Sequence, residues 1–251
     1  MANTLNRTFI SKYTKNYQKK LEQMKLLDII RTKGNKYKWF KTLFMPISRL
    51  IRERDERAMN RLFKAHGQQL FEDVYDVLGT EVDFWPEFGT LLGIYRDKGF
   101  IKHDNDLDFA IKVEDADKVK ELMIKNGFTL KKEYIGINHP EIRQLTLVKN
   151  GLGVDFFCYS THDSTMSVHI FHMHDVNLSE HKTYYRVRPI NFQKFGTIKH
   201  EFLGRQILIP ANCHEHLQLL YGPTYMTPDP NFKNPKNNML DNVLAVDLQS
   251  H

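Results

Sequence analysis

Residues 87–111 read EFGTLLGIYRDKGFIKHDNDLDFAI, a segment with three glycines and three closely spaced aspartates. Side chains that lie two residues apart share one face of a β-strand. A strand over 105–111 therefore places three carboxylates on one face: Asp104, Asp106 and Asp108. The opposite face is apolar and can pack against helices, because it carries Leu107, Phe109 and Ile111. Three like charges repel one another unless a divalent cation lies among them, so the pattern indicates a metal site.

A fourth carboxylate, Asp155, interrupts an apolar strand that we expect over 154–159. The preceding pair, Asn150-Gly151, is typical of a tight hairpin turn. A lone carboxylate in a buried strand is unfavourable unless it is paired or liganded. If this strand lies beside 105–111, the carboxylates can hold two Mg²⁺ ions, or Mn²⁺ in their place. The principal ligands and catalytic residues are then Asp106, Asp108 and Asp155.

The same stretch offers groups for a phosphate. Gly89-Thr90 opens a short helix expected over 90–95, whose free backbone N–H groups suit an anion, and Gly89 permits close approach. Arg96 and Lys98 can neutralise further phosphate charge. The candidate substrate contacts are Gly89, Thr90, Arg96, Lys98, His103 and Asp104, of which Asp104 is also a weaker metal ligand. Glu133 lies away from this set, so we expect it to tolerate replacement by Gln.

Each of these patterns has an alternative interpretation. Asp104, Asp106 and Asp108 can belong to a strand end that faces solvent. The glycines of this stretch can be required only for the geometry of turns. A zinc site at three nearby histidines is disfavoured, because two of them at most share a strand face and no cysteine pair is near. Those histidines are His169, His172 and His174. Four aromatic residues can form a box for a quaternary ammonium or belong to the core: Phe157, Tyr159, Tyr184 and Tyr185.

Helical and strand patterns alternate along the rest of the chain. Apolar residues at spacings of three and four predict helices over 36–54, 53–78 and 114–125, with Pro46 kinking or splitting the first and Gly79 ending the second. Strands are expected over 82–85, 128–134 and 142–148, and a hairpin over 202–209. Asn212 and Glu215 resemble a capping box for a last helix, and the tail after Thr227 reads as coil.

These patterns indicate an α+β fold with a mixed β-sheet and flanking helices. A basic helical extension, 1–65, precedes the domain 66–251. Residues 1–64 hold 17 Lys and Arg against 5 Asp and Glu, whereas the chain as a whole carries +6. A basic arm with an apolar stripe can bind an anionic membrane surface, and the alternative is that the stripe packs on the catalytic domain. Nucleic acid is disfavoured as a partner, because the clustered acids would repel its phosphates.

The cysteine content and the N-terminal residues bear on the compartment. Two cysteines, Cys158 and Cys213, make neither a disulfide framework nor a four-cysteine zinc site. Residues 1–20 contain no apolar segment of the kind that a secretory signal needs. We therefore expect a cytoplasmic protein that lies on the cytoplasmic face of a membrane if its basic arm binds there.

The string GTLLG-x-x-R-x-x-G-x-I-x-x-D-x-D-x-D, from Gly89 to Asp108, closely resembles the LicD family. That family includes bacterial phosphocholine transferases and is related to fukutin and fukutin-related phosphoribitol transferases. A second resemblance follows from Pro210 to Pro228, through Tyr221-Gly222 and Met226. The likeness spans about 84–230. It departs from many relatives at Lys102-His103, where they have Pro-Trp, and at Asn105, where they have Asp.

The resemblance implies a nucleotidyltransferase-like fold in which Asp106, Asp108 and Asp155 are the metal-binding acids and Asp104 matches an additional acid of the family. It also implies transfer of a phospho-alcohol, such as phosphocholine, from a CDP-alcohol to a sugar hydroxyl. The acceptor is then a cell-surface or lipid-linked glycan, as in the modification of lipopolysaccharide, capsule or teichoic acid. The alternative is a nucleotidyltransferase that moves a nucleoside monophosphate to a sugar or another small acceptor.

Overall fold

The computed structural model describes residues 38–136, 139–177, 182–229, 232 and 240–246. Side chains are described for residues 49–51, 53–136, 139–171, 187–229 and 232. The chain divides into two compact units, residues 1–59 and 60–251. No helix among the described residues is long and apolar enough to cross a membrane.

Helix α2 runs from Lys38 to Leu78 as one element. Pro46 therefore does not split it, because a proline removes one backbone hydrogen bond and the helix continues on both sides. The helix ends where the sequence predicts, and the N–H of Gly79 donates to the carbonyl of Tyr75 at 2.9 Å. In the first unit, Leu50 is exposed and Arg49 pairs with Glu53 one turn along the helix.

The elements that follow α2 agree closely with the predicted ones. They are β1 (Phe84–Pro86), α3 (Phe88–Leu92), the π-helical turn η1 (Gly93–Asp97), β2 (Asp106–Lys112), the 3₁₀ turn η2 (Val113–Asp115) and α4 (Ala116–Lys125). Next come β3 (Thr129–Gly136), β4 (His139–Lys149) and β5 (Leu152–His162). Asn150 and Gly151 both have positive φ, as the predicted tight turn between β4 and β5 requires.

The C-terminal half is built mainly of hairpins. Its elements are β6 (Thr165–Asn177), β7 (Lys182–Gln193), β8 (Thr197–Phe202), β9 (Arg205–Pro210), α5 (Cys213–Tyr221) and β10 (Leu240–Val246). Strands β8 and β9 form a separate two-stranded sheet, which confirms the predicted hairpin. Gly222, with φ +86, ends α5.

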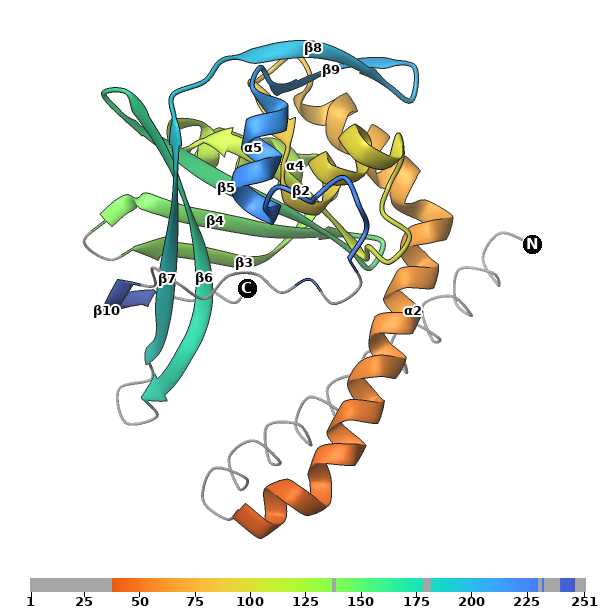
Figure 1. Cartoon of the computed structure of the whole chain (residues 1–251), viewed down its shortest axis with the longest axis vertical. Helices are drawn as coiled ribbons and strands as arrows, with labels where there is room; N and C mark the ends of the chain where they lie inside the picture. Colours follow the sequence, from red (N-terminus) through yellow and green to blue (C-terminus); the bar gives the residue numbers. More distant parts are fainter. Residues whose placement is uncertain (1–37, 137–138, 178–181, 230–231, 233–239, 247–251) are drawn as a thin grey trace. The chain divides into compact units, whose positions relative to one another are not determined.

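One mixed sheet organises the second unit (Figure 1). Its eight strands run in the order β1-β2-β5-β4-β3-β10-β7-β6, and β6 pairs with β5 as well, so the sheet curls back on itself. Strands β2 and β5 are parallel, whereas β1–β2, β3–β4 and β4–β5 are antiparallel. The α+β class with a mixed sheet is therefore confirmed.

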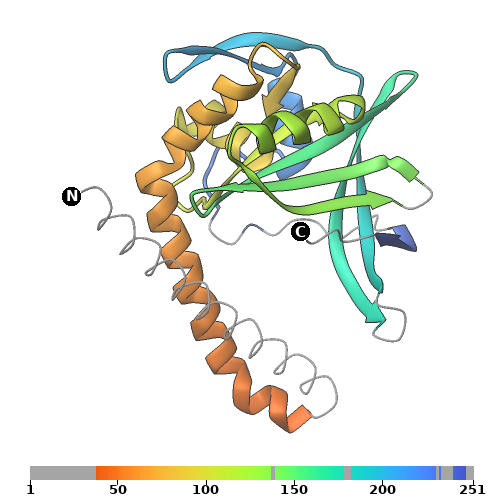
Figure 2. The ribbon, with the colours of Figure 1, turned by 180° about the vertical axis from the view of Figure 1, so that it is seen from behind.

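Helices cover both faces of this sheet. Helix α5 lies in front of the strands in Figure 1, and α4 lies in front of them in the opposite view of Figure 2. On the α4 face, Phe109 packs against Phe71 of α2 and Phe156 of β5. The core on the other face includes Trp85, Phe157, Tyr159 and Phe192. Asp106, Asp108 and Asp155 belong to this second face, because Asp108 and Asp155 alternate with the buried residues of the first.

Two expectations are wrong in the C-terminal half. The tail is not wholly coil, because β10 pairs with β3 and β7, which are remote in sequence. The long β6–β7 hairpin had no counterpart among the predicted strands. Asn212 precedes α5 but makes no capping hydrogen bond with its side chain, because its φ and ψ (−99° and 41°) are not those of an extended N-cap residue.

Candidate active site

Two parallel strands bring the predicted carboxylates together. Asp108 of β2 is the register partner of Asp155 of β5, and Asp106 is the partner of Gly153. A Cβ atom built on Gly153 would lie 3.7 Å from the Cβ of Asp106, so the backbone of β5 passes close to this side chain. The proximity of Asp106, Asp108 and Asp155 is therefore a product of the strand pairing.

Asp104 reaches the same cluster by a different route. It precedes β2, so a turn rather than strand alternation positions it, and its N–H donates to the carbonyl of Ile101 at 3.0 Å. The side-chain amide of Asn60 donates to the Asp104 carbonyl at 2.8 Å. A Cβ atom on Gly89 would lie 3.5 Å from Asp104 Oδ1 and 3.7 Å from Asp108 Oδ2. Gly89 thus keeps open the space beside two carboxylates, although it lies within α3 rather than before it.

The four carboxyl groups share an unusual electrostatic environment. Burial raises the pKa of Asp104 to about 7, and the charge of Asp106 adds to this rise. Burial and the charge of Asp155 raise the pKa of Asp106 to about 6. Burial also raises the pKa of Asp155, and burial together with Asp106 and Asp155 raises that of Asp108 well above its usual value. A cluster that resists ionisation in this way gains free energy when a cation binds among its members.

Hydrogen bonds hold the cluster in place. The hydroxyl of Thr146 on β4 donates to Asp155 Oδ1 at 2.5 Å. The buried hydroxyl of Thr90 accepts from the N–H of Asp108 at 2.9 Å. The N–H of Glu87 donates to the carbonyl of Asp108, also at 2.9 Å. Thr90, expected to contact substrate, therefore uses its hydroxyl to fix the strand that carries the carboxylates.

A buried polar network lies beside the cluster. Glu87, which precedes α3, is fully buried, and its Oε1 lies 2.7 Å from Nε2 of the buried His216 on α5. Its other oxygen accepts from the indole N–H of Trp85 at 3.0 Å. The His216 ring stacks on Phe192 with a centroid distance of 4.2 Å. This network joins α3 and α5, and the sequence pattern alone did not identify it.

The four carboxyl groups suit a hard cation, but their side chains are not arranged to coordinate one ion together. Carboxylate oxygens are the ligands that Mg²⁺ and Mn²⁺ prefer. Among the described side chains, however, no three His, Cys, Asp or Glu residues are placed to hold one metal ion. The carboxylates would therefore have to turn toward a shared ion. The chemistry of the donor set, four carboxyl groups, fits a divalent metal.

The predicted basic contacts mostly point elsewhere. Arg96 donates to both carboxylate oxygens of Asp97 and to the carbonyl of Tyr225, and its charge acts on the nearby Asp104. Lys98, at φ +53, donates to the carbonyl of Tyr95. His103 is exposed in the turn before Asp104. Arg96 thus links the C-terminal segment to the site, whereas the contacts of Lys98 lie within its own helical turn.

Most alternative features belong to the core or lie outside the described side chains. Phe157 packs edge-on against Phe88, and Tyr159 is buried against Trp85, so these two line the core. The side chains of Tyr184, Tyr185, His172 and His174 lie outside those described. His169 is buried, and Cys158 and Cys213 are free and buried. Burial raises the pKa of both thiols to about 12, so neither is a reactive thiolate near neutral pH.

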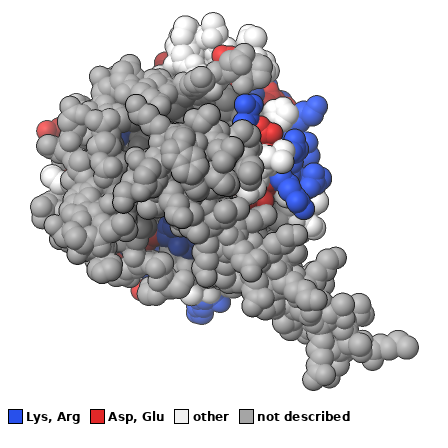
Figure 3. Space-filling model, turned by 90° about the horizontal axis from the view of Figure 1, so that it is seen from below, with Lys and Arg blue, Asp and Glu red and all other residues white. Residues whose placement is uncertain are grey.

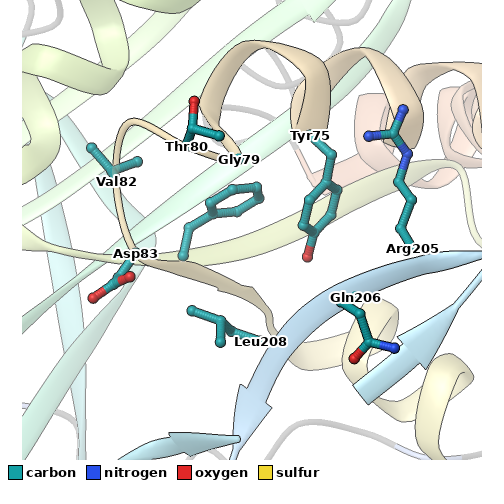
Figure 4. Close-up of a pocket in the computed structure, with 9 residues that line it drawn as sticks. Tyr75, Gly79, Thr80, Val82, Asp83, Arg205, Gln206 and Leu208 are labelled. Atoms are coloured by element: carbon teal, nitrogen blue, oxygen red, sulfur yellow. The ribbon is translucent and has the colours of Figure 1, made fainter. Parts of the chain in front are cut away.

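A separate hollow of about 310 Å³ lies away from the carboxylates (Figure 4). It is lined by Tyr75, Gly79, Thr80, Val82, Asp83, Phe84, Arg205, Gln206 and Leu208. Figure 4 shows Tyr75 extending toward the strand that carries Gln206. In the view of Figure 3, the described Lys and Arg side chains have Asp and Glu side chains among them. The lining of the hollow includes no residue of the acidic cluster.

Comparison with known proteins agrees with the geometry. A family model described as LicD/FKTN/FKRP, nucleotidyltransferase domain, matches residues 81–212. The match covers just over half of the chain, from the segment before β1 to the residue before α5, and includes all four carboxylates. The second resemblance noted in the sequence lies mostly beyond its end. A comparison with curated proteins finds no match.

Proposed function

The chain belongs to the LicD family, and from this premise we propose that it transfers a phospho-alcohol group from a CDP-alcohol to a sugar hydroxyl of a cell-surface or lipid-linked glycan. Phosphocholine is the model for the transferred group. The family is one of transferases, and the substrate and donor are part of the proposal. The observation that carries it is the pairing of Asp108 with Asp155 beside Asp106, three acids with raised pKa values on one face of the sheet.

Asp106, Asp108 and Asp155, with Asp104 as a weaker partner, would hold Mg²⁺ or Mn²⁺. When bound, such an ion supplies positive charge that offsets the carboxylates and the donor diphosphate. Gly89 leaves room beside Asp104 and Asp108, so the backbone at the start of α3 can approach a phosphate oxygen. The donor diphosphate would accordingly lie between α3 and the β2–β5 edge.

The acceptor hydroxyl attacks the distal phosphorus in line, and the bond from that phosphorus to the oxygen of CMP breaks. One oxygen of Asp155 accepts the Thr146 hydroxyl bond, which orients the carboxylate and leaves the other oxygen available. A carboxylate oxygen held in this way can accept a proton from the acceptor hydroxyl. Asp155 would take the proton of the acceptor hydroxyl and pass it to solvent, while CMP leaves.

The test is a product analysis with the full chain, Mg²⁺, a panel of CDP-alcohols and candidate glycans. The proposal requires release of CMP that depends on the glycan, with the phospho-alcohol recovered on the sugar. Absence of transfer from every CDP-alcohol, together with turnover of a nucleoside triphosphate, would refute it.

Transfer of a nucleoside monophosphate is the second candidate, because the matching family model describes a nucleotidyltransferase domain. The same carboxylates serve that reaction. Labelling the cytidine of the donor separates the two, since the label leaves with CMP in the first reaction and stays on the acceptor in the second.

A further inference from the structure

Four strands place one residue each in a single row across the carboxylate face. Asp108 of β2 pairs with Asp155 of β5, Asp155 pairs with Thr146 of β4, and Thr146 pairs with Lys132 of β3. Side chains of directly opposite residues point to the same face of a sheet. Lys132 therefore lies on the face that carries the acids.

A β-bulge produces this placement. The register of β3 against β4 shifts between Leu130 and Lys132, so that Lys131 is an additional residue inserted between the two paired positions. Leu130 is buried opposite Leu147, whereas Lys132 is exposed on the other face. The two residues would share a face in a regular strand. Bulges next to active sites commonly redirect a side chain in this way.

The neighbours of Lys132 confirm the face. Glu133, the next residue, is buried on the α4 face, where Lys120 of α4 donates to it. Tyr134, one further on, pairs with Gln144 and stacks on Phe171 of β6 with a centroid distance of 5.0 Å. Lys132 and Tyr134 therefore lie on the concave face of the curled sheet, and Glu133 lies on the opposite one.

The lysine is close enough to act on the site. Lys132 and Asp155 lie two strand spacings apart, so their backbones are about 10 Å from each other. The flexible four-carbon side chain of the lysine can span much of that distance. The charges of Lys132 and Lys131 both lower the pKa of Asp155, against the larger effect of burial, and Lys131 acts likewise on Asp106. Both lysines are exposed to solvent and thus to an incoming ligand.

We propose that Lys132, turned onto the carboxylate face by the bulge at Lys131, is the cationic side of the binding site and binds the diphosphate of the nucleotide donor. This rests on the proposed function. The acids and the lysine then face the donor from two directions: the acids through a divalent ion and the lysine directly. The sequence pattern, by contrast, indicates cationic contacts at Arg96 and Lys98.

Titration calorimetry of the full chain with CDP in Mg²⁺, and separately with inorganic pyrophosphate, tests the assignment. Lys132→Met should weaken the binding of both probes by about tenfold or more, as expected for loss of a charge-assisted contact. Lys132→Arg should stay within about threefold of the wild type, because the charge is kept. Lys199→Met, which removes an exposed lysine on β8, should bind as the wild type does.

Unchanged affinity of Lys132→Met for both probes would overturn the assignment, as would a wild type that binds neither. If Lys132→Met unfolds at a lower temperature, Lys132→Gln is measured in its place under the same criteria. Binding is read without turnover, so the two proposals fail separately. A wild type that binds CDP but transfers no phospho-alcohol refutes the proposed function and leaves the lysine assignment standing.

Discussion

Asp108 and Asp155 are register partners on adjacent parallel strands, although a helix and the β3–β4 hairpin separate them in the chain. Their side chains share one face, where burial raises the pKa of both carboxyl groups. Parallel pairing needs a long crossover connection. Here the connection contains β3, so it also supplies Lys132, the residue that follows the bulge at Lys131. The site is thus assembled by the topology of the sheet.

The pH dependence of stability should report this cluster. The folded-state pKa values of Asp104 and Asp106, about 7 and about 6, lie above their ordinary value of 3.8. Without metal, the folded chain therefore binds more protons than the unfolded chain between about pH 4 and pH 7, and its stability should fall as the pH rises through that window. In EDTA, Asp106→Asn should show a smaller fall in Tm than the wild type. Equal pH profiles for the two proteins would contradict the electrostatic description.

Glu133→Gln should destabilise the fold, contrary to what its position in the sequence indicates. Glu133 is buried and accepts hydrogen bonds from Arg143 and Lys120, so it is a poor neutral control. Removing its charge should cost on the order of 2 kcal/mol, the usual scale for a hydrogen bond to a charged group. Thermal unfolding beside Glu121→Gln, an exposed residue of α4, measures the difference. Matching Tm values for the two variants would show that the buried pair adds no net stability.

His216→Ala should lower both stability and activity. The change leaves the buried Glu87 without its 2.7 Å partner and opens a cavity beside Phe192. Loss of one partner of a buried polar pair costs about 3 kcal/mol or more. Because Glu87 also bonds the backbone of Asp108, the carboxylates should shift as well. Lys199→Ala, at an exposed residue of β8, serves as the control. A His216→Ala protein with wild-type Tm and turnover would exclude this role.

The basic arm remains a prediction from the sequence. Residues 36–54 combine Lys and Arg with Trp39, Phe40, Phe44 and Leu50, and we expect this stripe to enter the interface of an anionic membrane on its cytoplasmic face. The full chain should float with vesicles that contain phosphatidylglycerol but not with phosphatidylcholine alone. A protein lacking residues 1–52 should float with neither. If the full chain also stays unbound at moderate salt, the stripe has another partner, such as the catalytic body.

The sequence predicted the parts of the site that depend on local patterns. Alternation identified the acidic face around Asp106 and Asp108, and Asn150-Gly151 identified the turn that delivers Asp155. Contacts between distant segments were beyond that reasoning. Nothing near Lys132 in sequence shows that a bulge reverses its face, and nothing near His216 shows that Glu87 is its partner.

The same limit explains the errors in the fold. Strand β10 exists because β3 and β7 offer partners for it, whereas the composition of the tail favours coil. Helix α2 continues through Pro46, since one lost hydrogen bond is a local penalty in a 41-residue helix. Each error arose where tertiary pairing or helix length outweighed a local preference.

The most direct test of the account is transfer from CDP-choline, or from whichever CDP-alcohol is active, by Asp155→Asn beside Glu121→Gln. Asn keeps the shape of the side chain and removes the charge, so Asp155→Asn should fold, lose most of its thermal stabilisation by Mg²⁺ and turn over roughly a thousandfold more slowly. Asp106→Asn and Asp108→Asn should behave alike, and Glu121→Gln should match the wild type. Near-normal turnover by Asp155→Asn, or activity that EDTA leaves untouched, would contradict the central claim that these carboxylates form a metal-dependent transfer site.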